Sequence, residues 1–412
     1  MNMIQMKPTA GKQAQKLIFL CSVAYFVSYV CRINLAAVLV EVVDSGFAST
    51  RIAALALTLS SITYGAGQII SGWLGDRFKP HHLLIGGFGL TAAVNLLVAL
   101  LPSGTVLPFL WAVNGFAQSL MWPPLVVIMS GLLSETDYQK AVVRVSWGSS
   151  FGTIAVYLLS PVIIPLFGLR CVFVLCSATA LVMLTVWARQ FGGYYAPLLP
   201  EHSASNTASA GNQRPLPRLA FLLLALIMIA IMLQGSLRDG VSTWMPTYMA
   251  DTFQLSSSLS ILTGVILPLF SILSFQLTSV IHQHWLKNDM TCSAVIFGAG
   301  CLAALGLYLT NGHSMILSML CLALLVSSMH GVNLVLVCFT PRQFARFGRT
   351  GLISGVLNSA TYAGSALSGY GLALFSEAFG WHTTISLWAA IACFGLFLCL
   401  FLRKSWTAFT RF

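Results

Sequence analysis

The sequence predicts an all-α polytopic membrane protein, with twelve transmembrane helices in two six-helix pseudo-symmetric bundles. Of its 412 residues, 57% are hydrophobic and only 8% are charged, whereas an ordinary soluble domain is about 25% charged. The apolar runs each reach the roughly 20 residues that a spanning helix needs. A strand barrel is not expected, because transmembrane strands appear as short segments of alternating polarity.

Twelve apolar runs are long enough to cross a bilayer. The first is too long for a signal peptide, and no small-residue cleavage site follows it. We place the runs near 17–43, 52–75, 81–101, 105–133, 139–166, 168–190, 218–249, 256–281, 290–310, 314–340, 350–376 and 381–402.

The basic residues predict the orientation of these spans. Seventeen of the 21 lysines and arginines fall before span 1, after the even-numbered spans or at the C-terminus, whereas only Arg51 and Arg170 fall in the other connections. By the positive-inside rule both termini are cytoplasmic, and we expect a multi-pass protein of the bacterial plasma (inner) membrane. The net charge of +11 is therefore a signal of topology, and no nucleic-acid partner is expected.

One polar stretch divides the chain into two similar halves. Residues 191–216, rich in Ser, Ala, Gly, Asn and Pro, predict a cytoplasmic linker between six-helix bundles at 1–190 and 217–412. Arg32 and Arg238 are 206 residues apart, half of 412, and each lies in the first span of its half. Parallel repeats of this kind are typical of secondary transporters with a midplane site between the halves. Since two halves complete one pathway, we expect a monomer in the lipid bilayer.

Arg32 and Arg238 are the two basic residues expected deep inside the membrane, away from the ends of the predicted spans. Inserting an arginine at mid-membrane costs roughly 2.5–3.5 kcal/mol of free energy on insertion scales. An arginine at such a position is therefore expected to have a function. Its planar fork donates two parallel hydrogen bonds to a phosphate or carboxylate. The alternative is that each arginine pairs with a buried acid, but only Asp239 is clearly intramembrane. The sequence therefore favours a positive cavity for a small anionic substrate, with a doubly charged phosphate as the better match.

Tyrosines share a helix face with the first arginine. Tyr25, Tyr29 and Arg32 are spaced i, i+4, i+7, so they lie on one side of span 1. In span 2, Tyr64 and Gln68 are spaced i, i+4. Phenol hydroxyls on a cavity face can donate to phosphate oxygens, so we take all five residues as candidates for substrate binding.

Asp239 and His330 are candidates for ion coupling. Adjacent helix positions do not face each other, so Asp239 need not pair with Arg238. Asp239 could instead take a proton during transport, or it could pair with Arg32 until substrate displaces it. His330 and Asn333 share a face of span 10, and His330 is either a hydrogen-bonded core residue or one that responds to substrate charge.

Small residues and one loop predict close helix packing and gating. Gly148 with Gly152, Gly351 with Gly355, and the group Gly364, Ser365 and Ser368 allow helices to approach closely. Span 2 ends in "GWLGDRFKP", which contains Asp76 and Arg77; we take this stretch as support for helices that move and these two residues as candidates for gating, the alternative being an ordinary ion pair in a loop. Its counterpart after span 8, "HQHWLKND", is too degenerate to interpret.

Enzyme chemistry and cofactors are not expected. "GSSFG" at 148–152 spells G-x-S-x-G, but a nucleophile elbow needs a strand–turn–helix context, and this stretch lies inside a span. "HQH" at 282–284 and "HH" at 81–82 are predicted to lie in loops without further metal ligands. No Walker motif is present, which argues against ATP-driven transport.

Several of these stretches resemble one known family, and the resemblance extends from about residue 20 to about residue 400. The chain resembles the organophosphate:inorganic phosphate antiporters of the major facilitator superfamily, such as the bacterial glycerol-3-phosphate and hexose-phosphate transporters. Span 2 resembles the loop signature of that superfamily up to Arg77. The motifs that carry the resemblance are Y-x-x-x-Y-x-x-R at Tyr25, Tyr29 and Arg32, "ITYGAGQIISGWLGDR", "NGFAQSLMWPP" at 114–124, "LRDGVSTWMPTYM" at 237–249, and Tyr362.

The resemblance implies a role for each matching residue. It implies that Arg32 and Arg238 bind the phosphate group, that Tyr25, Tyr29, Tyr64 and Tyr362 line the cavity, and that His330 matches a span 10 histidine. It also implies alternating access with exchange of organic for inorganic phosphate. The chain departs from the glycerol-3-phosphate type at Gln68 (a lysine there), at Asp239 (a tyrosine), at Thr243 (an acid) and in "SWGSSFG", which lacks a histidine.

The leading hypothesis is a secondary transporter that exchanges a small organophosphate for inorganic phosphate. The first alternative is proton-coupled symport of an organic anion, with Asp239 or His330 carrying the proton. The second alternative is a membrane sensor that binds a phosphate ester.

Overall fold

The structure is a computed structural model, and it describes residues 11–101, 103–195, 216–254 and 266–411. All regular elements in these ranges are helical. The chain divides into two compact units: unit 1 comprises Met1–Arg214 and Phe344–Val356, and unit 2 comprises Pro215–Gln343 and Leu357–Phe412. The short segment that ends η6 and begins α14 thus groups with unit 1.

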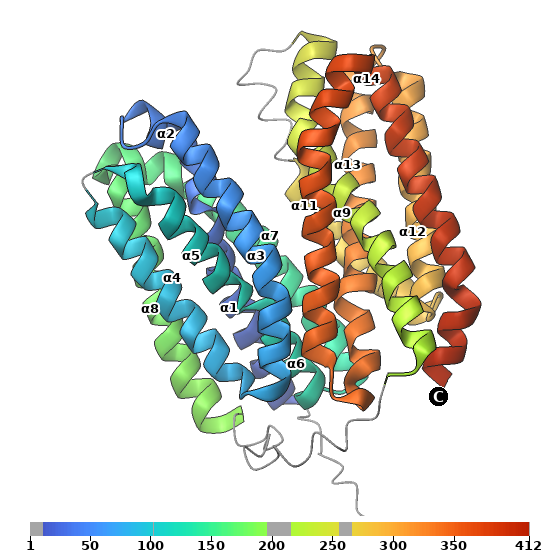
Figure 1. Cartoon of the computed structure of the whole chain (residues 1–412), viewed down its shortest axis with the longest axis horizontal. Helices are drawn as coiled ribbons and strands as arrows, with labels where there is room; N and C mark the ends of the chain where they lie inside the picture. Colours follow the sequence, from blue (N-terminus) through green and yellow to red (C-terminus); the bar gives the residue numbers. More distant parts are fainter. Residues whose placement is uncertain (1–10, 102, 196–215, 255–265, 412) are drawn as a thin grey trace, which may run out of the picture. The chain divides into compact units, whose positions relative to one another are not determined.

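Unit 1 is a bundle of long helices joined by short turns (Figure 1). Within it α1 packs along α7, α3 along α5, and α4 along α8. Its elements are α1 (Lys12–Ala37), α2 (Leu39–Asp44), α3 (Thr50–Arg77), α4 (Pro80–Leu100), η1 (Gly104–Val106), α5 (Leu107–Ser119), α6 (Trp122–Leu132), α7 (Glu135–Phe167), α8 (Leu169–Gln190) and η2 (Phe191–Tyr195).

Two predicted spans of unit 1 are interrupted. The span expected at 17–43 is α1 followed by the short helix α2, with a break at Val38. The span expected at 105–133 breaks between Ser119 and Trp122. Pro123 and Pro124 follow at once, and a proline removes a backbone donor and clashes with the carbonyl four residues earlier. Proline is tolerated in a first helical turn, so the chain starts a new helix there.

Unit 2 contains the second set of long helices (Figure 1). Its elements are α9 (Arg218–Phe253), α11 (Ile266–His284), α12 (Asp289–Thr310), α13 (Met315–Asn333), the π-helix η5 (Leu334–Phe339), the first half of the 3-10 helix η6 (Thr340–Phe347) and α14 (Thr350–Arg411) from Leu357 onward. The span expected at 314–340 is therefore α-helical only as far as Asn333. Gly380, with φ 75° and ψ 170°, is non-helical inside α14 and lies in the gap between the last two predicted spans.

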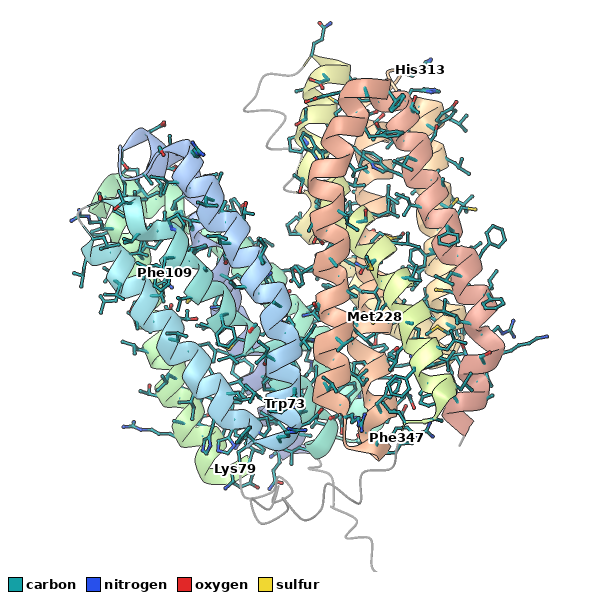
Figure 2. The ribbon with its side chains drawn as sticks, in the orientation of Figure 1. Trp73, Lys79, Phe109, Met228, His313 and Phe347 are labelled. Carbon is teal, nitrogen blue, oxygen red and sulfur yellow. The ribbon has the colours of Figure 1, made fainter. Side chains whose placement is uncertain are left out.

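The helices have the length and polarity of membrane spans. Among the described residues, eleven helices are long and apolar enough to cross a bilayer, and the span within α14 is Phe375–Thr410. Large apolar side chains lie on the outside, such as Phe109 of α5, 69% exposed and labelled in Figure 2, and Phe401 of α14, 74% exposed. A water-facing surface would not carry so many of them. The chain is a multi-pass membrane protein.

The expected linker at 191–216 begins later than predicted. Phe191–Tyr195 form the π-helical end of α8. The Phe191 ring stacks on Trp187 with the ring centroids 4.8 Å apart, and the Tyr195 hydroxyl donates to the carbonyl of Gln13 at 2.9 Å. These contacts keep the segment helical. Residues 196–215 lie outside the described part of the chain, as does the start of the span expected at 256–281.

The small-residue prediction is confirmed within each unit. A Cβ on Gly148 would lie 2.6 Å from the carbonyl oxygen of Ser22, and a Cβ on Gly152 would lie 2.7 Å from that of Phe26. In unit 2, Gly364 of α14 packs on the backbone of Met232 in α9. Glycine at these positions lets the helix backbones touch.

Candidate functional site

In unit 1, Arg32 lies among tyrosines from two helices. The guanidinium carbon of Arg32 is 3.7 Å from the ring centroid of Tyr64 on α3 and 5.4 Å from that of Tyr29 on α1. The Tyr64 side chain is buried, only 3% exposed. A guanidinium over an aromatic face at this distance makes a cation–π contact. Predicted site residues from two spans therefore meet here.

Tyr25 extends this cluster along α1. Its ring meets Tyr29 edge to face, with centroids 5.1 Å apart, and its ring centroid is 5.2 Å from that of Trp122 at the start of α6. Sequence reasoning used Trp122 only as part of a motif and did not place it in the site. Its signal was the Trp-Pro-Pro triplet, which starts a helix beside α1. Gln68 lies one turn beyond Tyr64 on α3, and its side chain is fully buried.

A buried hydrogen-bond network involves two further residues of α1, Ser28 and Asn34. The Ser28 hydroxyl donates to Gln118 Oε1 at 2.6 Å, and Gln118 Nε2 donates to the Thr91 hydroxyl at 3.0 Å. Asn34 Nδ2 donates to Asn95 Oδ1 at 2.7 Å. All five side chains are at most 3% exposed, and they join α1 to α4 and α5. Because each bond is directional, the network sets the rotation of α1 and hence the direction of Arg32.

In unit 2, Arg238 and Asp239 form an ion pair although they are adjacent on α9. Arg238 Nε donates to Asp239 Oδ1 at 2.6 Å, and Nη2 donates to Oδ2 at 2.9 Å. The expectation that these neighbours need not pair considered helix faces alone, whereas the long arginine side chain folds back to its neighbour. The carboxylate therefore occupies one complete edge of the guanidinium, and the pair is locally neutral.

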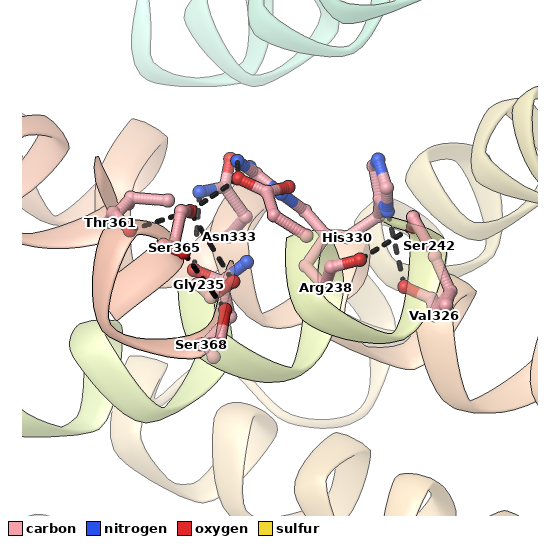
Figure 3. Close-up of polar contacts among 11 residues, drawn as sticks. Gly235, Arg238, Ser242, Val326, His330, Asn333, Thr361, Ser365 and Ser368 are labelled. Atoms are coloured by element: carbon pink, nitrogen blue, oxygen red, sulfur yellow. Dashed lines mark hydrogen bonds and ion pairs between the residues drawn. The ribbon is translucent and has the colours of Figure 1, made fainter. Parts of the chain in front are cut away.

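Ser365 of α14 holds the same carboxylate (Figure 3). Its hydroxyl donates to Asp239 Oδ2, and it is also within hydrogen-bonding distance of the carbonyls of Thr361, at 2.9 Å, and Gly235, at 3.4 Å. The Ser242 hydroxyl donates to the carbonyl of Arg238 at 2.5 Å. Sequence reasoning treated Ser365 only as a packing residue, because the spacing of small residues carries no information on polar contacts.

His330 and Asn333 lie in the same polar cluster. His330 Nδ1 donates to the carbonyl of Val326 at 3.1 Å, one turn back on α13, and its ring meets Phe275 at a centroid distance of 5.6 Å. Asn333 Nδ2 approaches Oε1 of the buried Gln234 on α9 at 3.4 Å. The close-up places His330 and Asn333 on either side of Arg238 (Figure 3). The predicted pairing of these residues on one face of span 10 is thus present beside the arginine.

Tyr362 belongs to α14, three residues before Ser365. Its side chain is half-buried. Residues three apart share a helix face, so Tyr362 is on the side of α14 that carries Ser365.

Asp76 and Arg77 end α3 and are not in a loop. The guanidinium carbon of Arg77 lies 4.0 Å from the ring centroid of Trp73, which is labelled in Figure 2. Asp76 accepts hydrogen bonds from backbone N–H groups at the start of α14. The two residues therefore point to different neighbours, although they are adjacent in the sequence.

The histidines predicted to lie in loops are helical and partly buried. His282 belongs to the last turn of α11, is 6% exposed, and its Nε2 lies 2.8 Å from Asp289 Oδ1. His81 is the second residue of α4 and is 5% exposed. The prediction of loops was wrong because α4 already begins at Pro80, where proline suits a first helical turn, and α11 continues to His284. Within the described ranges, no group of three or more His, Cys, Asp or Glu could hold a metal ion.

The chain is similar in sequence to known membrane proteins. A family model described as Major Facilitator Superfamily matches residues 21–369. The glycerol-3-phosphate transporter of Bacillus subtilis (strain 168) is 33% identical over 106 residues, 25% of this chain and 24% of that protein. A probable hexose phosphate transport protein of Chlamydia muridarum (strain MoPn / Nigg) is 26% identical over 112 residues, 27% of this chain and 23% of that protein. The chain thus aligns with about a quarter of the length of these curated relatives.

A solved structure shows the same fold over nearly the whole chain. The human organic anion transporter MFSD10 (TETRAN) superimposes with a TM-score of 0.76 at 15% identity, covering 94% of this chain and 100% of that one. At this identity the likeness concerns the fold alone.

Proposed function

Because the chain belongs to the Major Facilitator Superfamily, we propose that it is a secondary active transporter of a small anionic organic metabolite, exchanged for inorganic phosphate. The predicted family and fold class are confirmed by the family match and the common fold. The substrate class is our proposal. It is supported by the names of the curated relatives, a glycerol-3-phosphate transporter and a hexose phosphate transport protein.

The observation that carries the proposal is the position of Arg32. Its guanidinium carbon lies over the Tyr64 ring, 3.7 Å from the ring centroid, within an apolar helix bundle. This cation–π contact stabilises the charge inside the bundle, and a guanidinium recognises a phosphate or carboxylate through its N–H donors. We propose that Arg32 presents these donors to the anion, with the rings of Tyr29 and Tyr64 beside it.

Arg238 supports the proposal in a different way. It lies in the first helix of unit 2 and its carboxylate partner already demonstrates the bidentate geometry that an anionic substrate would use. We propose that Arg32 and Arg238 both serve the substrate, with Tyr25, Tyr362, Gln68 and His330 contributing contacts. Asp76 and Arg77 are proposed to act in gating.

The remaining parts of the mechanism are proposals from sequence. We propose that residues 1–190 and 217–412 act as two repeats joined by a linker, and that transport proceeds by alternating access in the manner of repeat-built transporters. The charge bias of the connections supports cytoplasmic termini in a bacterial plasma membrane. We further propose that the monomer is the working unit.

Exchange by purified protein in proteoliposomes tests the proposal. Vesicles loaded with inorganic phosphate are given labelled phosphate, followed by competing glycerol 3-phosphate, glucose 6-phosphate and pyruvate. We expect phosphate exchange, competition by the phosphate esters, and loss of exchange in Arg32→Lys and Arg238→Lys, because lysine cannot form the bidentate contact. Arg51→Lys, which changes an exposed arginine at the start of α3, is the matched control.

Two outcomes would count against this function. Normal exchange in both lysine variants would remove the arginines from the site. Absence of phosphate exchange, together with anion uptake that follows an imposed pH gradient, would favour proton-coupled symport, the alternative to which the intramembrane Asp239 points.

A further inference from the structure

One edge of the Arg238 guanidinium is already occupied by an anion. Nε and Nη2 of Arg238 both donate to the carboxylate of Asp239. These two donors form one of the edges that bind a phosphate or carboxylate bidentately. An incoming anion that uses this edge must therefore take the place of Asp239.

Asp239 is the partner in this ion pair that an incoming anion can displace from Arg238. Its side chain is 35% exposed, against 15% for Arg238, so the carboxylate is the more accessible member of the pair. If the guanidinium is lost as a partner, the Ser365 hydroxyl still donates to Oδ2. Since this serine belongs to α14, the displaced carboxylate keeps a hydrogen bond without leaving the cluster.

Displacement changes the charge balance of the cluster. The ion pair is neutral, so an arriving anion leaves two or more negative charges around one guanidinium, and these like charges repel each other. The charged or titratable groups that face Asp239 are Arg238 on its own helix and His330 on α13, while Cys338 of η5 lies near Arg238. From α14 the described contacts with Asp239 come from a hydroxyl, that of Ser365. Asp239 itself can restore the balance by accepting a proton.

We propose that a substrate anion displaces Asp239 from Arg238 and that the displaced carboxylate takes up a proton released by a buffer acid in the surrounding solvent, so that anion binding and protonation of Asp239 are linked. This inference rests on the proposed function, because it assumes that Arg238 binds the anion. A new O–H bond forms on Asp239, and the resulting acid donates to the Ser365 hydroxyl oxygen. Because linkage is reciprocal, protonation of Asp239 in turn strengthens anion binding.

Calorimetric titration of the full-length protein in detergent tests the proposal. The probes are inorganic phosphate and sulfate, since sulfate keeps its charge across neutral pH and adds no protons of its own. Repeating the titration in buffers of different ionisation enthalpy gives the number of protons taken up. For the wild type we expect about one proton per bound sulfate, with binding that strengthens as the pH falls.

Three variants identify the proton acceptor. Asp239→Asn should bind sulfate about tenfold more tightly and take up no proton, because the competing charge is gone. Asp239→Glu should keep the proton uptake, because the proton acceptor is a carboxyl group in both proteins. Asp251→Asn, which removes another carboxylate of α9, exposed and bonded to Trp381, should behave as the wild type. Size exclusion and thermal unfolding establish that each variant is folded.

Several results would overturn the inference. It fails if Asp239→Asn binds no more tightly than the wild type, if it takes up the same number of protons, or if proton uptake is lost in His330→Gln instead. If Arg238→Lys loses binding while Asp239→Asn matches the wild type, the proposed function stands and only this inference fails. If the wild type binds neither probe nor any phosphate ester, both fail together.

Discussion

The carboxylate of Asp76 accepts a hydrogen bond from the backbone N–H of Gly351, 2.7 Å away at the start of α14, and a second from Leu352 at the same distance. The first N–H groups of a helix have no partner inside the helix, and the positive end of the helix dipole favours an anion there. A Cβ on Gly351 would lie 2.6 Å from the carbonyl of Gly72 and 2.8 Å from Asp76 Oδ1. Asp76, Gly72 and Gly351 therefore form one close contact within unit 1.

Asp76→Asn should lower thermal stability and slow exchange. Asparagine keeps one acceptor oxygen but loses the second acceptor and the charge, and capping interactions of this kind contribute about 0.5–2 kcal/mol. The midpoint of unfolding in detergent and the initial rate of exchange in proteoliposomes measure the two effects. Asp44→Asn, at the exposed end of α2, should leave both unchanged. If the two variants behave alike, the contact of Asp76 with α14 has no role in stability or gating.

The ring of Tyr64 should contribute more to anion affinity than its hydroxyl does. Tyr64→Phe keeps the cation–π contact with Arg32, whereas Tyr64→Ala removes it, and such contacts contribute about 0.5–2 kcal/mol. We expect anion affinity to fall about fivefold to tenfold in the alanine variant and to change little in the phenylalanine variant. Equal losses in both variants would show instead that the hydroxyl binds the anion directly.

Gly152 should tolerate no side chain. A Cβ there would lie 2.7 Å from the Phe26 carbonyl and 3.0 Å from Tyr29 Cβ, so Gly152→Ala must push α1 away at the turn that precedes Arg32. We expect a lower unfolding temperature and weaker phosphate exchange. Gly86→Ala on α4, where a Cβ meets nothing within 4 Å, is the control and should be neutral or slightly stabilising. If Gly152→Ala has the unfolding temperature and phosphate exchange of the wild type, the position of α1 is not fixed by this contact.

Gln118 should contribute stability through its two hydrogen bonds. Gln118→Met keeps most of the side-chain volume but leaves the Ser28 and Thr91 hydroxyls without this buried partner, at a cost of about 1–3 kcal/mol for each group left unsatisfied. Gln118→Ala adds the cost of a cavity. The unfolding temperature should therefore be highest for the wild type, lower for Gln118→Met and lowest for Gln118→Ala. If Gln118→Met is as stable as the wild type, the hydrogen bonds of Gln118 are not needed for stability.

The spans were predictable because bilayer thickness imposes a length on every apolar run. The breaks within these apolar runs were harder to predict from the sequence. The break before Pro123 could have been inferred from proline chemistry, whereas no local pattern in the sequence indicated the π-helical turn Leu334–Phe339. The helical end at Phe191 was also missed, since its ring stacking on Trp187 is visible only in the folded chain.

The candidate site was predictable at the level of single helix faces. Spacing placed Tyr25, Tyr29 and Arg32 together, but contacts between helices, such as Arg32 with Tyr64, required the folded bundle. The pairing of Arg238 with Asp239 was missed because side-chain torsions, which spacing ignores, bring neighbours together.

The two arginine-bearing helices rest on supports of different stiffness. α1 is fastened by directional amide and hydroxyl bonds to α4 and α5, so turning it by even part of a helical step breaks several bonds at once. α9 instead touches α14 where Gly235 meets the Thr361 backbone and Gly364 meets that of Met232. Such smooth backbone contacts resist approach but oppose sliding only weakly. Within its own unit, Arg32 is therefore mounted as a fixed post, and Arg238 is carried on a bearing.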